Sequence, residues 1–212
     1  MRAFKSFVAA QGLMAAAVLT GCMAEEGTWD DQDVGEYSSE LTQEGTQGPH
    51  CVVESVAQRQ GEAPPTELDM APARCFETFS DAIFAATDGR VRLAPSVTAQ
   101  TVDEQTLRGG DMNAPLATFV IAIEYQHINF GGATMTITSS VTCDGYNHSF
   151  PFSSFPAGWN DIISSARAFS NCNNSYHYEH AGFGGAVVNC GSACSYVGNA
   201  MNDRTSSIFW TR

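Results

Sequence analysis

Basic residues are scarce in this chain. Its 212 residues include 10 Lys and Arg against 23 Asp and Glu, which gives a formal net charge of -13. A chain this acidic repels polyanions, so we expect no nucleic-acid partner. The same charge attracts cations, which makes a cationic ligand compatible with the composition.

The sequence also lacks the common motifs of catalysis and of structural zinc. It contains no GxSxG, no HExxH, no phosphate-binding glycine loop and no CxxC pair. The segment SYHYEHAG, which holds His177, Glu179 and His180, resembles a metal site at first sight. In a strand, however, His177 and His180 would point to opposite faces. We therefore do not expect an enzyme.

No apolar run is long enough to span a bilayer. The longest, from Phe7 to Val18, follows Arg2 and Lys5 and is typical of a secretory signal peptide. The sequence LTGC that follows it resembles a bacterial lipobox, which implies cleavage after residue 21 and lipid attachment at Cys22. An ordinary signal peptide with a nearby cysteine is the alternative. Met23, and not an aspartate, follows the cysteine. By resemblance to enterobacterial lipoprotein sorting, this favours an outer-membrane lipoprotein of the bacterial cell envelope, on its periplasmic face or at the cell surface.

The cysteines agree with export. Without Cys22 an even set of six remains, as is usual for disulfides in an oxidising compartment. Fifteen pairings are possible in principle, and proximity in the sequence favours three of them: Cys51 with Cys75, Cys143 with Cys172, and Cys190 with Cys194.

Composition divides the mature chain into three parts. Residues 22–48 are acidic and poor in apolar side chains, which predicts a disordered tether. Residues 49–110 form a small segment of unknown role, in which Phe79, Ile83 and Ala86 have helical spacing, with Thr78 as N-cap and Gly89 as stop. Residues 111–212 are rich in alternating and β-branched stretches. Strands are predicted at 117–125, 133–141 and 207–210.

The β-rich part contains an internal repeat. The segment IEYQHINFGGATMTI aligns with YHYEHAGFGGAVVNC at an offset of 53, and NDIISS aligns with NDRTSS at an offset of 42. The first unit therefore has eleven extra residues between its two landmarks. Repetition with an insertion indicates a duplicated fold unit. In each YxxxxFGG landmark the glycines allow positive φ at a tight hairpin turn, and the aromatic side chains cover it.

Two aromatic–FGG–NDxxSS patterns in this order resemble the βγ-crystallin family and its microbial relatives. These include calcium-binding spore-coat proteins of myxobacteria and small Greek-key metalloproteinase inhibitors of actinobacteria. The resemblance covers Ala117 to Arg212. It implies an all-β sandwich of two Greek-key motifs, preceded here by the acidic tether and a disulfide-stapled segment with one short helix.

NDxxSS is rich in the oxygen donors that calcium prefers. The resemblance implies two calcium ions, each bound by parts of both copies. The implied donors are the side chains of Asp161, Ser164, Asp203 and Ser206, the carbonyls of Ile162 and Arg204, the carbonyls of Gln126 and Glu179, and Asn160 and Asn202 as ligands or turn formers. Asn, Asp and Ser also form turns without any metal, and this alternative remains open.

Two functions follow as hypotheses. The first is a lipid-anchored, calcium-binding module with a structural or adhesive role in the cell envelope. The second is an exported peptidase inhibitor of the same fold, supported by the short span from Cys190 to Cys194 that a disulfide would rigidify. The expected partners are calcium, the membrane, and either a secreted protease or an envelope component.

Overall fold

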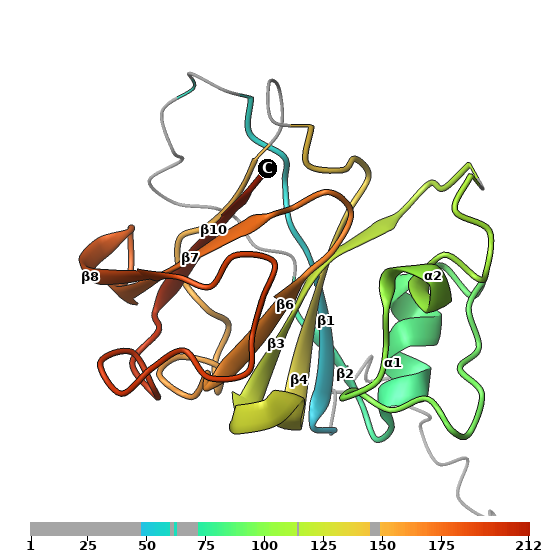
Figure 1. Cartoon of the computed structure of the whole chain (residues 1–212), viewed down its shortest axis with the longest axis horizontal. Coiled ribbons are helices and arrows are strands. Elements are labelled where there is room, and N and C mark those ends of the chain that lie inside the picture. The colour runs from blue at the N-terminus through green and yellow to red at the C-terminus, as the bar shows by residue number, and fades with distance from the viewer. Residues whose placement is uncertain (1–47, 60–61, 63–71, 114, 145–148) are drawn as a thin grey trace, which may run out of the picture. The chain divides into compact units, whose positions relative to one another are not determined.

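The computed structural model describes residues 48–59, 62, 72–113, 115–144 and 149–212. The predicted signal peptide (1–21), Cys22 and all of the predicted tether but its last residue lie outside the described residues. The described part contains two sheets and two helices, which confirms the all-β prediction (Figure 1). Neither helix is long and apolar enough to cross a membrane.

The two sheets pack face to face. In spatial order, the six-stranded sheet consists of β2 (Arg74–Phe76), β1 (His50–Glu54), β4 (Gly131–Ser139), β3 (Phe119–His127), β6 (Ser165–Ala168) and β9 (Ala193–Cys194). The four-stranded sheet consists of β5 (Phe150–Phe152), β10 (Ser207–Thr211), β7 (Asn174–His180) and β8 (Gly184–Asn189). Met135, Ile137, Phe150, Ile208 and Trp210 are fully buried in one core cluster that includes side chains of both sheets.

The repeat is visible in the strand order. The first unit supplies β3 to β6 and the second supplies β7 to β10, and each unit places its third strand in the sheet of the other. Thus β5 pairs with β10, and β9 pairs with β6. This exchange joins the two Greek-key units into one sandwich, as the resemblance implied.

The segment before the repeats is part of the same sheet. β1 pairs in parallel with β4, with Cys51 opposite Met135, and β2 pairs with the other edge of β1. The Cys51–Cys75 disulfide joins β1 to β2. Sequence analysis did not predict these two strands. They cover the edge of β4, whereas its counterpart β8 ends its sheet.

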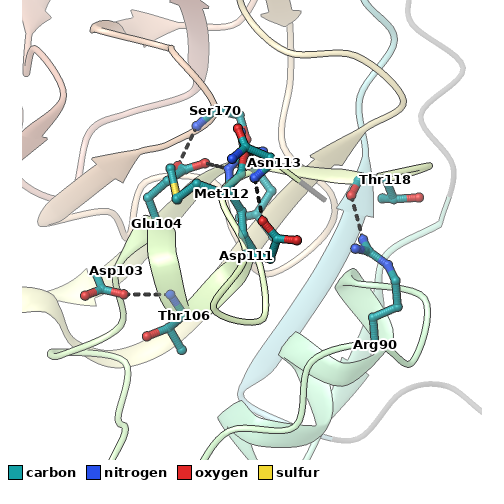
Figure 2. Close-up of polar contacts among 11 residues, drawn as sticks. Arg90, Asp103, Glu104, Thr106, Asp111, Met112, Asn113, Thr118 and Ser170 are labelled. Carbon is teal, nitrogen blue, oxygen red and sulfur yellow. Dashed lines mark hydrogen bonds and ion pairs between the residues drawn. The ribbon is translucent and has the colours of Figure 1, made fainter. Parts of the chain in front are cut away.

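The predicted helix is present as α1 (Phe79–Ala86). Thr78 caps it by accepting a hydrogen bond of 3.1 Å from the backbone N–H of Asp81. A second short helix, α2 (Glu104–Leu107), was not predicted, because a single turn has no periodicity to detect. Figure 2 shows its cap, in which Asp103 accepts a bond of 2.8 Å from the N–H of Thr106.

The helical segment covers the outer face of the six-stranded sheet (Figure 1). Its side chains share a second core cluster with Val52, Ile123 and Tyr125 from the sheet. Polar contacts fasten it there. The carboxylate of Glu104 accepts a bond of 2.8 Å from the N–H of Ser170, and Arg90 donates a bond of 3.0 Å to the carbonyl of Thr118 (Figure 2).

The three disulfides are those that proximity in the sequence favoured. Cys51–Cys75, Cys143–Cys172 and Cys190–Cys194 are all formed, which confirms the predicted pairs. The first lies in the segment before the repeats, and the other two lie within the repeats. Cross-links of this kind restrict the unfolded chain and so favour the folded state.

Candidate metal centre

Each repeat begins with an aromatic hairpin that has the same geometry twice. The rings of Tyr125 and Phe130 lie 5.4 Å apart, and those of Tyr178 and Phe183 lie 5.6 Å apart, both edge to face. The predicted roles of the tyrosines and phenylalanines as covers of the turn agree with this packing. These hairpins fix the ends of β3 and β7, next to the NDxxSS loops.

Positive φ was expected at both glycines of each FGG. Only the second glycine of each has it. Gly132 has φ +76, and a Cβ there would lie 2.7 Å from the His127 ring. Gly185 repeats this with φ +77 and a distance of 2.9 Å to His180. Gly131 has φ -105, which any residue adopts. The positive φ expected there occurs one residue earlier, at Phe130, because the chain turns before the glycines.

The two NDxxSS loops lie side by side and are bonded to each other. The N–H of Asp161 donates to the carbonyl of Thr205 at 3.1 Å, and the N–H of Asp203 donates to that of Ile163 at 3.2 Å. Asp161 and Asp203 both have positive φ, 59° and 55°. The two copies therefore form a pair with approximate two-fold symmetry.

This pairing brings each aspartate to the serine of the other copy. The hydroxyl of Ser206 donates to Asp161 Oδ1 at 2.9 Å. The hydroxyl of Ser164 lies 3.2 Å from Asp203 Oδ1 and donates to the carbonyl of Gln126 at 2.8 Å. We call the group Gln126, Ile162, Ser164 and Asp203 the first clamp, and the group Glu179, Arg204, Ser206 and Asp161 the second clamp.

The asparagines hold the aspartates in place. Asn160 donates to Asp161 Oδ2 at 2.6 Å, and Asn202 donates to Asp203 Oδ2 at 2.7 Å. The Oδ1 atoms remain directed at the clamps. The Oδ1 of Asn202 is itself buried and has no hydrogen-bond partner in the described part of the chain. It is thus a free oxygen donor beside the first clamp.

The two serines of each motif have different tasks. Ser165 donates to the carbonyl of His127 at 2.6 Å and accepts from the N–H of Phe130 at 3.0 Å. Ser207 repeats both contacts with His180 at 2.7 Å and Phe183 at 3.0 Å. The second serine therefore secures the aromatic hairpin, and only the first serine faces the clamp.

The clamps differ in the two side chains that flank them. Ile162 and Gln126 line an open hollow at the first clamp. Their counterparts in the second clamp, Arg204 and Glu179, form an ion pair. The N–H of Ala186 donates to the Glu179 carboxylate at 3.2 Å, and this bond, together with the nearby Arg204, lowers the pKa of Glu179.

The donor set is one of hard oxygens. A carboxylate oxygen and a serine hydroxyl meet at each clamp, and the carbonyl of Gln126 joins them at the first. Oxygen ligands of this kind suit calcium and not zinc, whose structural sites use histidine nitrogen and cysteine sulfur. Nowhere among the described residues do three or more His, Cys, Asp or Glu side chains gather as a metal site. His177 is fully buried and His180 is exposed, so they do lie on opposite faces of β7.

Sequence analysis missed two features. Tyr196 and Ile128 line the hollow beside the first clamp. Tyr196 lies outside both repeat landmarks, and Ile128 lies at a variable position of the first. Glu124 and His177 form a buried pair in the core. The alignment of the two repeats places Glu124 on His177, so their correspondence was visible in the sequence, but their contact was not.

Known proteins resemble this chain over part of its length. No protein-family model and no curated protein matches the chain. Solved structures of similar fold are βγ-crystallin domains. One from Clostridium beijerinckii is 21% identical and covers 43% of this chain and 99% of its own, with a TM-score of 0.33. One from Flavobacterium johnsoniae is 22% identical, with 42% and 90% covered and a TM-score of 0.33. One from an archaeon is 24% identical, with 44% and 98% covered and a TM-score of 0.32.

Proposed function

We propose that this chain is an exported, lipid-anchored protein that binds two calcium ions and has a structural or adhesive, non-enzymatic role in the cell envelope. The observation that carries calcium binding is the reciprocal pairing of Ser164 with Asp203 and of Ser206 with Asp161. A turn-forming motif needs no contact between its two copies. Oxygen donors from both copies directed at one point are the arrangement that a shared ion requires.

The first clamp would offer the Asp203 carboxylate, the Ser164 hydroxyl, and the carbonyls of Gln126 and Ile162. The second would offer the Asp161 carboxylate, the Ser206 hydroxyl, and the carbonyls of Glu179 and Arg204. With one carboxylate each, both sites should have dissociation constants in the extracellular range of about 10⁻⁴ to 10⁻³ M. Calcium at 100 times its dissociation constant would stabilise the fold by about 2.7 kcal/mol per site.

A thermal melt of the full chain tests this. Cys22→Ser would be introduced to prevent lipidation, and the melting temperature would be measured in chelator, in calcium and in magnesium. We expect the melting temperature to rise in calcium and not in magnesium. This increase should be smaller in Asp161→Asn and in Asp203→Asn, and absent in the double variant. The exposed Asp111, which accepts a bond only within its own loop from Asn113, gives the matched control Asp111→Asn. An equal rise in the double variant would refute the clamps.

The envelope location rests on the N-terminal sequence and on the three disulfides, which require an oxidising compartment. Lipid attachment at Cys22 would hold the chain on an outer membrane, on its periplasmic face or at the cell surface. Mass spectrometry of the N-terminal peptide from bacterial membranes tests this. Acyl chains on Cys22, and release of Cys22→Ser into the soluble fraction, are the expected results.

The second candidate is an exported peptidase inhibitor. Its supporting observation is the Cys190–Cys194 disulfide, which closes a short loop whose Ser192 and Ala193 are exposed. The backbone of that loop is already engaged, because the N–H of Ala168 donates to the carbonyl of Ser192 at 2.8 Å. This engagement favours the calcium-binding function. Inhibition of any enzyme in a panel of secreted metalloproteases would reverse that preference.

A further inference from the structure

A hollow of about 720 Å³ opens beside the first clamp. Ser164, Asn202 and Asp203 lie on its polar side. Ile128 and Tyr196 line it as well, with 52% and 41% of their surfaces exposed. Large exposed apolar side chains next to convergent polar groups are typical of a ligand site.

The walls of the hollow are fixed to each other. Ile128 belongs to the turn between β3 and β4, where the N–H of the next residue, Asn129, donates to the carbonyl of Ser195 at 2.8 Å. On the other side of Tyr196, the N–H of Val197 donates to the carbonyl of Ser164 at 2.9 Å. The hydroxyl of Tyr196 bonds to Asn199. A preformed wall of this kind lowers the entropy cost of binding.

The second clamp has a different surrounding. Its fold is the same, but Arg204 and Glu179 stand where the first clamp has Ile162 and Gln126, and these two side chains form an ion pair. Arg204 also bonds to the carbonyl of Ala200 at 3.4 Å. The hollow beside the first clamp is therefore lined by uncharged side chains at the two positions where the second clamp carries an ion pair.

We propose that this hollow binds a neutral saccharide, with two neighbouring hydroxyls at the first clamp and the sugar ring against Tyr196 and Ile128. The inference rests on the proposed calcium binding. Calcium takes six to eight oxygen ligands, and the first clamp with Asn202 offers about five, so positions remain for ligand oxygens. The apolar side chains suit the C–H face of a sugar ring, while the amide of Asn129 suits its other hydroxyls.

Charge selects the neutral ligand over an acidic one. The chain has a net charge of -13, and a carboxylate of the first clamp, that of Asp203, faces the hollow. Hydroxyl groups bring oxygen donors to the ion without adding to this charge. An anionic glycan would be repelled on approach by the acidic chain as a whole, even though a bound calcium ion would make the clamp itself positive.

Retention on sugar-substituted agarose tests the proposal. The full chain with Cys22→Ser would be applied to mannose-, galactose- and N-acetylglucosamine-agarose in calcium, in magnesium and in chelator. We expect retention on at least one resin in calcium only. Tyr196→Ala should weaken it about tenfold, the size expected for loss of one packed aromatic face, without changing the calcium-induced rise in melting temperature. Val187→Ala, at an exposed apolar side chain of β8 outside the hollow, is the matched control and should bind normally.

The outcomes separate the two proposals. Suppose that calcium raises the melting temperature but no resin retains the protein, or that Tyr196→Ala does not weaken retention. Either result overturns the saccharide site and leaves calcium binding in place. Retention that persists in chelator, with no rise in melting temperature, overturns the calcium clamp and the inference with it. Glucuronic acid-agarose, run alongside the three neutral resins, tests the charge of the ligand: binding confined to that resin overturns the assignment of a neutral ligand.

Discussion

Glu124 and His177 occupy the same position in the two repeats, and the fold brings them together in the core, with His177 Nε2 3.9 Å from Glu124 Oε2. Both side chains are fully buried. Ser175 lies 2.7 Å from the same imidazole nitrogen, while both carboxyl oxygens lack a hydrogen-bond partner among the described residues. Burial raises the pKa of Glu124 well above its usual value and lowers the pKa of His177 to about 3. Burial thus favours the neutral form of both groups in the folded protein.

Glu124→Gln should stabilise the protein at neutral pH. The unfolded chain releases the Glu124 proton near pH 4.5, whereas the folded protein keeps it. A raised pKa of this kind makes the free energy of unfolding fall by about 1.4 kcal/mol per pH unit as pH rises above 4.5, until the folded pKa is reached. Glutamine cannot ionise and removes this loss. Urea unfolding at pH 4 and pH 7 should show a gain at pH 7 that is much smaller at pH 4.

The exposed Glu54 provides the control, because Glu54→Gln changes the same group outside the core. Its effect on unfolding should be small at both pH values. Equal destabilisation by Glu124→Gln at pH 4 and at pH 7 would mean that the pair is ionised in the folded protein. The neutral-pair assignment would then be wrong.

His177 acts in the opposite direction. Its lowered pKa means that the folded protein stays unprotonated at this site as pH falls below 6.5, while the unfolded chain takes up a proton. The resulting stability is complete above pH 6.5 and decreases by about 1.4 kcal/mol per pH unit between 6.5 and about 3. NMR of the imidazole carbons should show no titration of His177 from pH 8 to pH 5. In denaturant the same residue should titrate near 6.5. A transition of the folded signal within that range would contradict the assignment.

The two serines of each NDxxSS motif should separate stability from calcium binding. Ser165→Ala removes two hydrogen bonds by which a buried hydroxyl holds the hairpin, so it should cost about 1 to 3 kcal/mol of unfolding free energy in chelator. Ser164→Ala removes an oxygen donor of the first clamp and should mainly weaken calcium binding. Urea unfolding in chelator and calorimetric calcium titration measure the two effects. Ser207→Ala and Ser206→Ala repeat the experiment in the second copy, and the same loss from both serines of a motif would refute this division.

The second glycine of FGG should not tolerate a side chain. Gly132→Ala adds left-handed strain and a Cβ that would lie 2.7 Å from the His127 ring. Gly110 and Gly158 also have positive φ, +85 and +87, but open space around the missing Cβ. Gly110→Ala and Gly158→Ala therefore measure the strain alone, about 1 kcal/mol. Thermal melts should show a larger loss of stability for Gly132→Ala and Gly185→Ala than for these two controls. Equal losses in all four variants would mean that the histidine contacts do not contribute.

The repeat landmarks made much of the fold predictable, because each one dictates local backbone geometry. Phe130 and Gly132 require a tight turn, and NDxxSS requires a bend before a strand. The pairing of β1 with β4 could not be predicted in this way. Val53 lies opposite Ile137, more than eighty residues further along the chain, and no local pattern in HCVVE selects that partner or its register.

The site was predictable only as far as the repeat extends. Asp161, Ser164, Asp203 and Ser206 were singled out because they recur, and the structure brings them together in crossed pairs. Tyr196 lies in a loop without a recognised counterpart, and its distance from Ile128 depends on how the two turns pack. The sequence showed that Ile162 in the first copy is replaced by Arg204 in the second. Only the structure showed that Arg204 forms an ion pair with Glu179.

Arg204 should lower the calcium affinity of the second clamp. Its guanidinium is a positive charge on the residue whose carbonyl is a proposed ligand, and it also neutralises Glu179. Arg204→Ala removes that repulsion and frees the carboxylate, so calorimetry should show severalfold tighter binding at one of two sites. Glu179→Gln leaves Arg204 unpaired and should weaken the same site. Both effects should diminish at high salt, because the pair is exposed to solvent.

The Arg108–Glu104 ion pair on α2 supplies the control for Arg204→Ala. Arg108→Ala breaks a pair of the same kind outside both clamps, so it should leave both calcium affinities unchanged. Tightening by Arg108→Ala as well would mean that net charge governs binding. Arg204→Ala and Glu179→Gln could shift the calcium affinity of one site in opposite directions and leave the other site constant. This result would show that the two clamps bind separate ions. A shift of both sites together would instead mean that the crossed loops respond as one unit.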